Sequence, residues 1–125
     1  MGKEAFDRKV SCHFAWSYHM NDFVQMVPLD CQANHAGASK YDGRKHCNEF
    51  SIGIELPGPF GGIISHDVMQ KLDILTTKIK SVINITDCCG HCHIAPGRRM
   101  DPGKEFKFKE FCLKHDLIFK GEENG

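Results

Sequence analysis

The sequence predicts an α/β fold in which a mixed central β-sheet is flanked by helices. Apolar and polar residues alternate over residues 10–17, which is the pattern of a strand with one buried face. A nearly continuous apolar run at residues 50–56 suits a strand that is buried on both faces. Apolar residues then recur at steps of four and three over residues 68–82, as they do on an amphipathic helix. Strands that alternate with helices are typical of the α/β class.

The first strand is expected to turn back as a hairpin. Residues 20–22, Met-Asn-Asp, offer turn chemistry, and residues 23–27 have the pattern of the returning strand, which Pro28 ends. Residues 30–47 are rich in Gly, Asn and His and are too long for a plain connection, so they form a candidate binding loop. Residues 57–62 then break the chain.

The clearest helix is expected after Ser65, a residue type that caps helix N-termini. Its predicted apolar stripe is Val68, Leu72, Leu75, Ile79 and Val82, and its predicted solvent-facing residues are Lys71, Asp73, Lys78 and Lys80. Residues 81–86 are expected to form a last strand that delivers residues 88–93 at its end. A C-terminal helix is expected from about Glu105, on the spacing of Phe108, Phe111 and Cys112.

Length and composition fit one globular domain. The 125 residues allow one compact core, and 41% hydrophobic with 26% charged residues is ordinary globular usage. The expected division is an N-terminal extension at 1–9, one domain at 10–120 and a flexible tail at 121–125. Sixteen basic residues balance sixteen acidic ones, so neither nucleic acid nor membrane is an expected partner. Because no membrane-span length and no apolar signal core are seen, a cytoplasmic location is expected.

The seven cysteines are odd in number and irregularly spaced, which favours free thiols over a disulfide framework. Cys89 and Cys92 form a Cys-x-x-Cys pair, but a dithiol oxidoreductase needs a helix N-terminus after the motif, and residues 94–97 are expected to start none. A further alternative is a compact metal knot of Cys88, Cys89, His91, Cys92 and His93. Structural zinc sites pair two separated ligand couples, and no second couple is evident.

The most informative stretch is residues 90–103. His91 and Asp101 lie ten residues apart around a Pro- and Gly-rich loop that contains two arginines. This loop is expected not to be helical, because its prolines remove backbone donors and its glycines permit turns. A folded-back loop would bring His91 and Asp101 to one point. Imidazole and carboxylate are ligands of catalytic zinc, whose sites keep one position open for water.

Other segments accompany this loop in a fixed order: Val-Ser-Cys-His-Phe at residues 10–14, His-Ala-Gly-Ala-Ser at 35–39, and Cys-Asn-Glu-Phe-Ser-Ile-Gly-Ile-Glu-Leu at 47–56. Together they resemble the type-2 N-acetylmuramoyl-L-alanine amidases, specifically the AmpD-like branch. That family also includes phage amidase-type lysozymes and, more distantly, animal peptidoglycan-recognition proteins. The resemblance covers about residues 10–111 and implies the amidase type-2, peptidoglycan-recognition-like fold, shortened at the N-terminus.

The resemblance also implies an activity, which is zinc-dependent hydrolysis of the amide between N-acetylmuramic acid and L-alanine in peptidoglycan fragments (muropeptides). His91 and Asp101 match the second and third zinc ligands of the family. Glu55 matches the catalytic glutamate, which takes a proton from the attacking water and passes it to the leaving amine. Arg99 stands where members commonly have a lysine that stabilises the oxyanion. Positions around the substrate groove are matched by His35, Arg44 and Asn48.

The family's first zinc ligand, a histidine that ends an opening apolar strand, has no match here. The chain resembles the family's second strand from residue 10 onward, and no histidine precedes His13. The candidates for a surrogate third zinc ligand are His13, His35 and His93. Besides hydrolysis, two alternatives stay open: a degenerate member that binds a muropeptide or another ligand without cleavage, and a scaffold that binds a protein partner. Glu55 taken alone also suits a structural carboxylate paired with an arginine.

Overall fold

The computed structural model of the chain describes residues 11–58 and 64–121. The predicted N-terminal extension, the first residue of the predicted first strand, residues 59–62 of the predicted break and residues 122–125 of the predicted tail lie outside this part. Gly121, the first residue of the predicted tail, is buried. A Cβ at Gly121 would come within 2.5 Å of Phe119 and 2.7 Å of His93, so the chain is packed up to this point.

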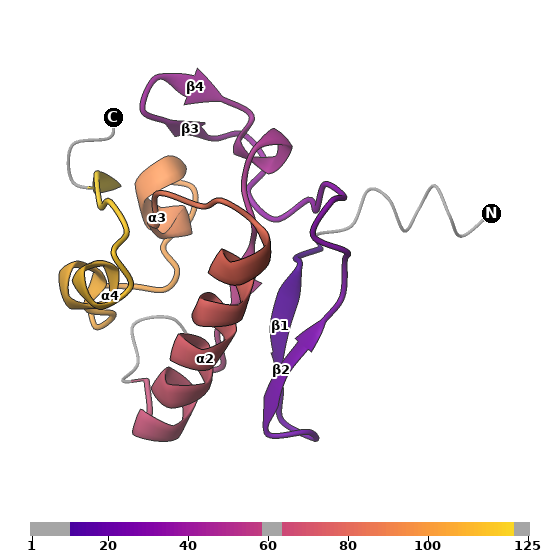
Figure 1. Cartoon of the computed structure of the whole chain (residues 1–125). Coiled ribbons are helices and arrows are strands. Elements are labelled where there is room, and N and C mark those ends of the chain that lie inside the picture. The colour runs from indigo at the N-terminus through magenta and orange to yellow at the C-terminus, as the bar shows by residue number, and fades with distance from the viewer. Residues whose placement is uncertain (1–10, 59–63, 122–125) are drawn as a thin grey trace.

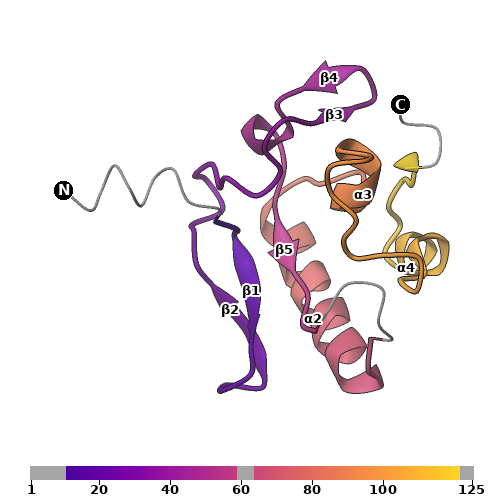
Figure 2. The same ribbon diagram turned by 180° about the vertical axis from the view of Figure 1, so that it is seen from behind.

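The central sheet is mixed, as the sequence predicts. Its strand order is β2-β1-β5, with β1 antiparallel to β2 and parallel to β5. Figures 1 and 2 show these strands beside the long helix α2, with α3 and α4 beyond it. The strands of this sheet are β1 (Phe14–Ser17), β2 (Asp22–Gln25) and β5 (Ile54–Glu55). The helices are η1 (Cys47–Glu49), α2 (His66–Val82), α3 (His91–Ile94) and α4 (Phe108–Lys114).

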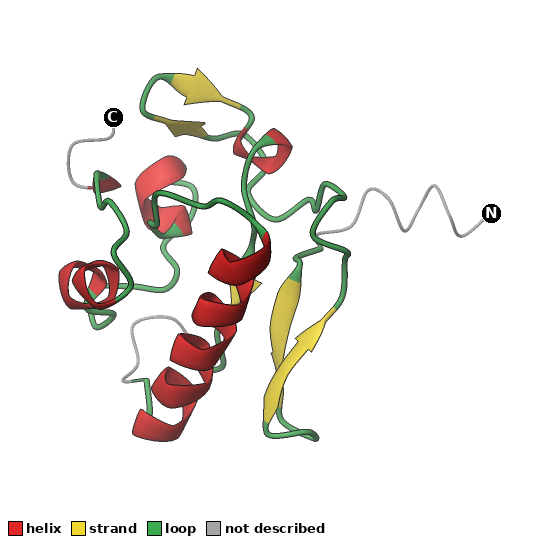
Figure 3. Ribbon diagram, in the orientation of Figure 1, coloured by secondary structure: helices red, strands yellow, loops and turns green. Residues whose placement is uncertain are grey.

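The predicted N-terminal hairpin is present, although both strands are shorter than expected. Trp16 and Phe23 lie opposite each other in the β1–β2 ladder, and their rings meet edge to face at 5.2 Å. The predicted strand at residues 50–56 is also short, because only Ile54 and Glu55 pair with β1. Loops account for much of the chain around these elements (Figure 3).

The predicted binding loop at residues 30–47 contains a second, two-stranded sheet. Strand β3 (Lys40–Tyr41) pairs with β4 (Arg44–Lys45) across Asp42 and Gly43. Both turn residues have positive φ, 51° and 84°, which is the pattern of a type I′ turn. Asp-Gly is a strong local signal for this turn, so the hairpin was readable in the sequence.

Helix α2 begins where the sequence predicts. The Ser65 hydroxyl accepts a hydrogen bond from the backbone N–H of Val68 at 3.2 Å. The buried residues of the helix are Val68, Leu72, Thr76 and Ile79. The predicted stripe was wrong at its end, because Val82 is 69% exposed. Asp73 was wrongly placed toward solvent, because it binds Lys114 and His115, each at 2.6 Å. Lys80 was wrongly placed there too, since its ammonium reaches the His115 carbonyl.

The predicted last strand at residues 81–86 was wrong. Helix α2 continues through Val82, and the following segment forms a single parallel bridge between Asp87 and Ile118. The C-terminal helix is present, but α4 starts at Phe108 instead of about Glu105. A tight turn delays its start, because the Phe108 N–H donates to the Phe106 carbonyl at 3.0 Å.

Most of the core lies between α2, α4 and the sheet. One buried cluster consists of Leu72, Phe106, Phe108, Phe111, Cys112 and Leu117. A smaller cluster of Ala36, Cys47 and Ile94 joins α3 to the β3–β4 region. Within residues 11–58 and 64–121, no helix combines the length and apolar character needed to cross a membrane.

Candidate metal and active site

The loop at residues 90–103 folds back on itself as predicted, but it contains one helical turn that the sequence analysis excluded. In α3 the Ala95 N–H donates to the His91 carbonyl at 2.9 Å. Pro96 follows this last intrahelical donor, so its missing N–H limits the helix to one turn without preventing it. The Cys92 N–H donates to the Asp101 carbonyl at 2.9 Å and closes the loop.

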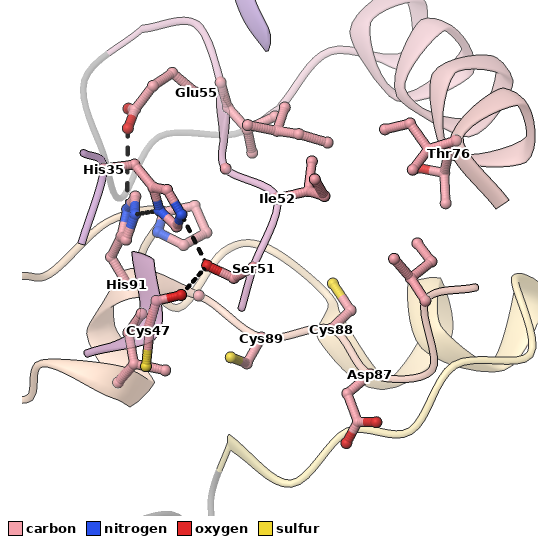
Figure 4. Close-up of a pocket in the computed structure, with 18 of the residues that line it drawn as sticks. His35, Cys47, Ser51, Ile52, Glu55, Thr76, Asp87, Cys88, Cys89 and His91 are labelled. Carbon is pink, nitrogen blue, oxygen red and sulfur yellow. Dashed lines mark hydrogen bonds and ion pairs between the residues drawn. The ribbon is translucent and has the colours of Figure 1, made fainter. Parts of the chain in front are cut away.

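The closed loop brings the predicted metal ligands together with Glu55. Nδ1 of His91 lies 2.6 Å from Oδ2 of Asp101 and 4.0 Å from Oε2 of Glu55. These three residues form a group whose candidate ligand atoms all lie within 4.8 Å of one another. Figure 4 shows the Glu55 carboxylate directed at the His91 ring. In the described part of the chain, Oε2 of Glu55 is a buried polar atom without a hydrogen-bond partner.

A hydrogen-bond chain behind the cluster orients the His91 ring. The Ser51 hydroxyl donates to the Cys47 carbonyl at 2.6 Å, so its oxygen is left to accept from Nε2 of His35 at 2.9 Å. Nδ1 of His35 then accepts from Nε2 of His91 at 3.0 Å. A neutral His91 with its proton on Nε2 presents the lone pair of Nδ1 to Asp101 and Glu55. This is the outer-shell arrangement that fixes the tautomer of a metal-binding histidine.

His35 is built into this chain rather than into an open groove. It is 4% exposed, and a Cβ added at Gly53 would come within 2.4 Å of its ring. Burial, aided by His91, His13 and Arg99, lowers the pKa of His35 to about 4. His35 is therefore neutral at pH 7, which suits a residue that donates from one ring nitrogen and accepts at the other.

Two adjacent arginines join the loop that contains His35 (the His35 loop) to the loop at residues 90–103 (the metal loop). Arg99 donates from Nη1 to the His35 carbonyl at 2.9 Å and from Nε to Oδ1 of Asp101 at 3.2 Å. Arg98 donates to the carbonyls of Ala36 and Ala38. Its guanidinium lies beside Gly37, whose φ is +65° and whose Cβ position would be 3.1 Å from Nη2 of Arg98. A side chain at Gly37 would therefore be strained and would crowd the clamp.

The two carboxylates of the cluster have opposite pKa shifts. Burial raises the pKa of Glu55, and although His91 and Arg99 oppose this, Asp101 adds to it. Burial acts in the same direction on Asp101, but its close contacts with His91 and Arg99 outweigh it and hold the pKa of Asp101 below its usual value. Asp101 thus favours the charged form that a metal ligand needs, while Glu55 is shifted toward holding a proton.

The remaining predicted residues lie around the cluster. Oδ1 of Asn48 accepts from the N–H groups of His35 and Ala36 at 3.1 and 2.8 Å, so Asn48 holds the His35 loop. Arg44 is exposed on β4, with its guanidinium 4.0 Å from the centre of the Phe50 ring.

The candidate surrogate ligands His13, His35 and His93 are not brought into the cluster. Nε2 of His13 donates to the Cys31 carbonyl at 2.7 Å, and its Nδ1 accepts from the Gly53 N–H at 3.1 Å. Nδ1 of His93 accepts from the Gly90 N–H at 2.9 Å, and its ring packs on two phenylalanines.

The thiols near the metal loop do not form a redox or metal site. Although α3 starts within the Cys89–Cys92 motif, burial raises the pKa of Cys89 to about 12 and also raises the pKa of Cys92. A dithiol oxidoreductase needs the opposite shift. Among the described residues, the group that could hold a metal ion is formed by Glu55, His91 and Asp101, and it contains no cysteine.

A cavity of about 1010 Å³ opens from the cluster into the domain. Glu55, His91, Arg99 and Asp101 line its polar end. Figure 4 shows Thr76, Asp87, Cys88 and Cys89 around another part of the same cavity. The polar end offers charged groups to a ligand, whereas the part under α2 is lined by apolar side chains such as Leu72 and Ile79.

Sequence reasoning missed Ser51 and Arg98. Both stand inside motifs that the sequence analysis quoted, at the serine of Ser-Ile-Gly-Ile-Glu and at the first arginine of the Pro/Gly loop. Arg98 binds the backbone carbonyls of Ala36 and Ala38, and Ser51 joins the Cys47 carbonyl to Nε2 of His35. Backbone partners leave no residue-type signal, and the contact between Ser51 and His35 depends on the folded chain, so the residue types alone did not indicate these roles.

Comparison with known proteins shows the family of the chain. Residues 2–104 match the protein family described as N-acetylmuramoyl-L-alanine amidase (Amidase_2). The 1,6-anhydro-N-acetylmuramyl-L-alanine amidase AmpD of Salmonella typhimurium is 47% identical over 92 residues, which are 72% of this chain and 49% of that protein. The chain spans about half the length of the curated relatives it matches.

Solved structures give the same result for the fold. A crystal structure of an AmpD derivative matches with a TM-score of 0.70 and 38% identity, covering 88% of this chain and 61% of the other. The amidase AmiD from E. coli, in complex with anhydro-N-acetylmuramic acid-L-Ala-D-gamma-Glu-L-Lys, matches with a TM-score of 0.75 and 26% identity over 89% of this chain and 49% of AmiD. The chain therefore belongs to the type-2 N-acetylmuramoyl-L-alanine amidase family, in its AmpD-like branch.

Proposed function

We propose that this chain binds zinc and hydrolyses the amide between N-acetylmuramic acid and L-alanine in muropeptides. The observation that carries the proposal is the cluster of Glu55, His91 and Asp101 at the polar end of the cavity. The substrate class is supported by the AmiD complex, whose bound substrate contains this linkage. The cytoplasmic location stays a prediction.

The donor set fits zinc, with Nδ1 of His91 and a carboxylate oxygen of Asp101 as ligands. The hydrogen-bond chain through His35 leaves Nδ1 of His91 to face the cluster, and Arg99 holds Asp101 from its outer side. Bound zinc lowers the pKa of a coordinated water to about 7 and polarises a carbonyl group.

Glu55 is proposed as the general base and acid. Its unpartnered Oε2 lies 4.0 Å from Nδ1 of His91, which places it beside the metal position without using the atom in another contact. Because its pKa is raised, the carboxylate holds a proton more readily than an exposed glutamate and passes it to the leaving amine. Arg99 is proposed to stabilise the oxyanion with the guanidinium that also binds Asp101.

Exchange of Glu55 for glutamine tests the proposal. We expect Glu55→Gln to keep the zinc affinity of the wild type, measured by chelator competition, while turnover falls roughly 100- to 10,000-fold. Turnover is followed as peptide released from anhydro-N-acetylmuramic acid-L-Ala-D-gamma-Glu-L-Lys, and Glu110→Gln on the exposed face of α4 is the matched control. Equal turnover by wild type and Glu55→Gln would refute the role of Glu55. A parallel loss of zinc would instead make Glu55 a ligand.

A second candidate function is binding of a muropeptide without cleavage. It is favoured by the number of ligands, because catalytic zinc usually has three protein ligands and the cluster supplies two besides Glu55. In that case the wild type releases no peptide from the same substrate, yet calorimetry detects its binding. The scaffold alternative would be left if neither cleavage nor binding is observed.

A further inference from the structure

A pair of cysteines connects the two ends of the segment that carries the metal loop. Cys112 on α4 is buried, and its thiol donates to the Cys88 carbonyl at 3.8 Å. Cys88 packs against the main core cluster, to which Cys112 belongs. The two residues are 24 positions apart in the chain, and the whole metal loop at residues 90–103 lies between them.

Backbone hydrogen bonds hold the two cysteines beside each other. The Cys88 N–H donates to the Ile118 carbonyl at 3.0 Å, and the Cys112 carbonyl accepts from the Leu117 N–H at 2.8 Å. Leu117 and Ile118 are consecutive residues, so their Cα atoms are about 3.8 Å apart. Each cysteine is therefore bonded to one of two neighbouring residues, and their contact is part of the packing of α4 against the segment that precedes the metal loop.

The two thiols also contact each other. A hydrogen bond with the Cys112 side chain raises the pKa of the Cys88 thiol well above its usual value, and burial adds to this effect. The same hydrogen bond lowers the pKa of Cys112, although burial opposes it. Sulfur atoms in direct contact reach bonding distance by small movements of the two side chains.

We propose that Cys88 and Cys112 form a reversible disulfide that fastens α4 to the segment preceding the metal loop. The oxidant is a small peroxide such as hydrogen peroxide, which reaches the Cys88 sulfur through the cavity that this residue lines. Figure 4 shows the Cys88 sulfur among the cavity side chains, with the Cys89 sulfur on a different side of the chain.

The reaction consumes one peroxide and both thiols. The Cys88 sulfur bonds to one peroxide oxygen and becomes a sulfenic acid, while the Cys88 proton leaves with the other oxygen as water. The Cys112 sulfur then bonds to the Cys88 sulfur, and the Cys112 proton leaves with the hydroxyl group as a second water. Its lowered pKa makes Cys112 the better nucleophile of the pair for this second step. A dithiol reductant reverses the reaction by thiol–disulfide exchange.

The disulfide would close a loop that contains His91, Arg99 and Asp101. A crosslink removes loop-closure entropy from the unfolded chain, and for a loop of this length it favours the folded state by roughly 100-fold. Oxidation would thus hold α4 and the metal loop together under conditions in which the reduced chain opens. This effect needs neither zinc nor cleavage of a substrate, so it is measured on the metal-free chain.

Oxidation of the full chain carrying Cys31→Ser tests the pair, because this exchange removes an exposed thiol that could join two chains. We expect hydrogen peroxide to give a monomer that has lost two hydrogen atoms, in which Cys88 and Cys112 are linked by mass-spectrometric mapping. Dithiothreitol should restore both thiols. In urea, the unfolding equilibrium constant of the oxidised chain should be about 100-fold smaller than that of the reduced chain. Linkage between other cysteines, or sulfinic acids without linkage, would overturn the proposal.

Neighbouring cysteines supply the matched variants. In the same background, Cys88→Ser should lose both the linkage and the gain in stability on oxidation, whereas Cys89→Ser, one residue away and also on the cavity wall, should keep both. An equal gain in stability by Cys88→Ser would refute the assignment. If Cys88→Ser fails to fold, Cys112→Ser replaces it, and the mapping of the linked residues in the Cys31→Ser chain decides.

Discussion

The properties of His91 are decided by residues that lie behind it. Ser51 and His35 determine which ring nitrogen of His91 carries the proton, and neither of them belongs to the metal group. The sequence placed His35 among the substrate-binding positions because its motif resembles one that surrounds the groove. Which ring nitrogens are engaged depends on partners far away in the chain, so the residue type alone could not indicate this positioning role.

The hydrogen-bond chain leads to a prediction at Ser51. Removal of the hydroxyl in Ser51→Ala leaves Nε2 of His35 without its acceptor. The His35 ring is then no longer held, and His91 can carry its proton on either ring nitrogen. Loss of such an outer-shell partner typically costs 10- to 100-fold in metal affinity, and we expect a loss of that size for zinc by chelator competition. Ser51→Thr, which keeps the hydroxyl, should restore most of the affinity. Zinc binding by Ser51→Ala at the wild-type level would show that the chain of hydrogen bonds does not orient His91.

At the scale of elements, a charged group joins α2 to α4. Asp73 on α2 is bound by Lys114 and His115 at the end of α4, and its side chain is 19% exposed. Burial opposes ionisation of Asp73, but the hydrogen bonds from Lys114 and His115 outweigh it and hold the pKa of Asp73 below 3.8. The contact between the helices is thus linked to pH.

We expect Asp73→Asn to lower the free energy of unfolding by about 1 to 3 kcal/mol at neutral pH. Because the folded-state pKa of Asp73 is depressed, its contribution is present above pH 3.8 and is lost as the pH falls through the folded-state value. The difference between wild type and variant should therefore shrink below pH 3.8 in urea unfolding curves. Asp67→Asn, which removes an exposed pair with Lys71, is the control with little expected effect. A difference that persists at low pH would contradict the linkage.

The elements that the sequence predicted best are those with local signals. Helix α2 has a cap at Ser65 and a helical apolar period, and the β1–β2 hairpin alternates around a turn, so neither depends on distant parts of the chain. The structure of residues 81–86, by contrast, depends on distant parts of the chain. Their Val-Ile-Asn-Ile pattern suits a strand, but Ser81 and Val82 end α2, and the bridge to Ile118 is made by Asp87, beyond the predicted strand. Within residues 11–58 and 64–121 this segment makes a single bridge and no ladder, so the pattern alone could not predict this outcome.

At the scale of the whole molecule, the candidate site and part of the apolar core line the same cavity. The cavity begins at Glu55, His91 and Asp101 and continues under α2. The motifs indicated Glu55, His91 and Asp101, because these residue types carry their own chemistry. The apolar part of the cavity could not be predicted, because it lies between β5, α2 and residues 84–89, which are far apart in the sequence.

An apolar space of this size should bind a hydrophobic dye in the native state. Dry cavities lined by Leu, Ile and Phe take up small apolar molecules, so we expect 1-anilinonaphthalene-8-sulfonate to bind the folded protein at neutral pH with raised fluorescence. Thr76→Phe should reduce that fluorescence and raise the free energy of unfolding by about 0.5 to 2 kcal/mol, since it fills space that the wild type leaves open. Thr77→Phe places the same ring on the exposed side of the helix and should do neither. Dye binding that is the same in all three proteins would place the dye on the surface, because only Thr76 among these positions borders the cavity.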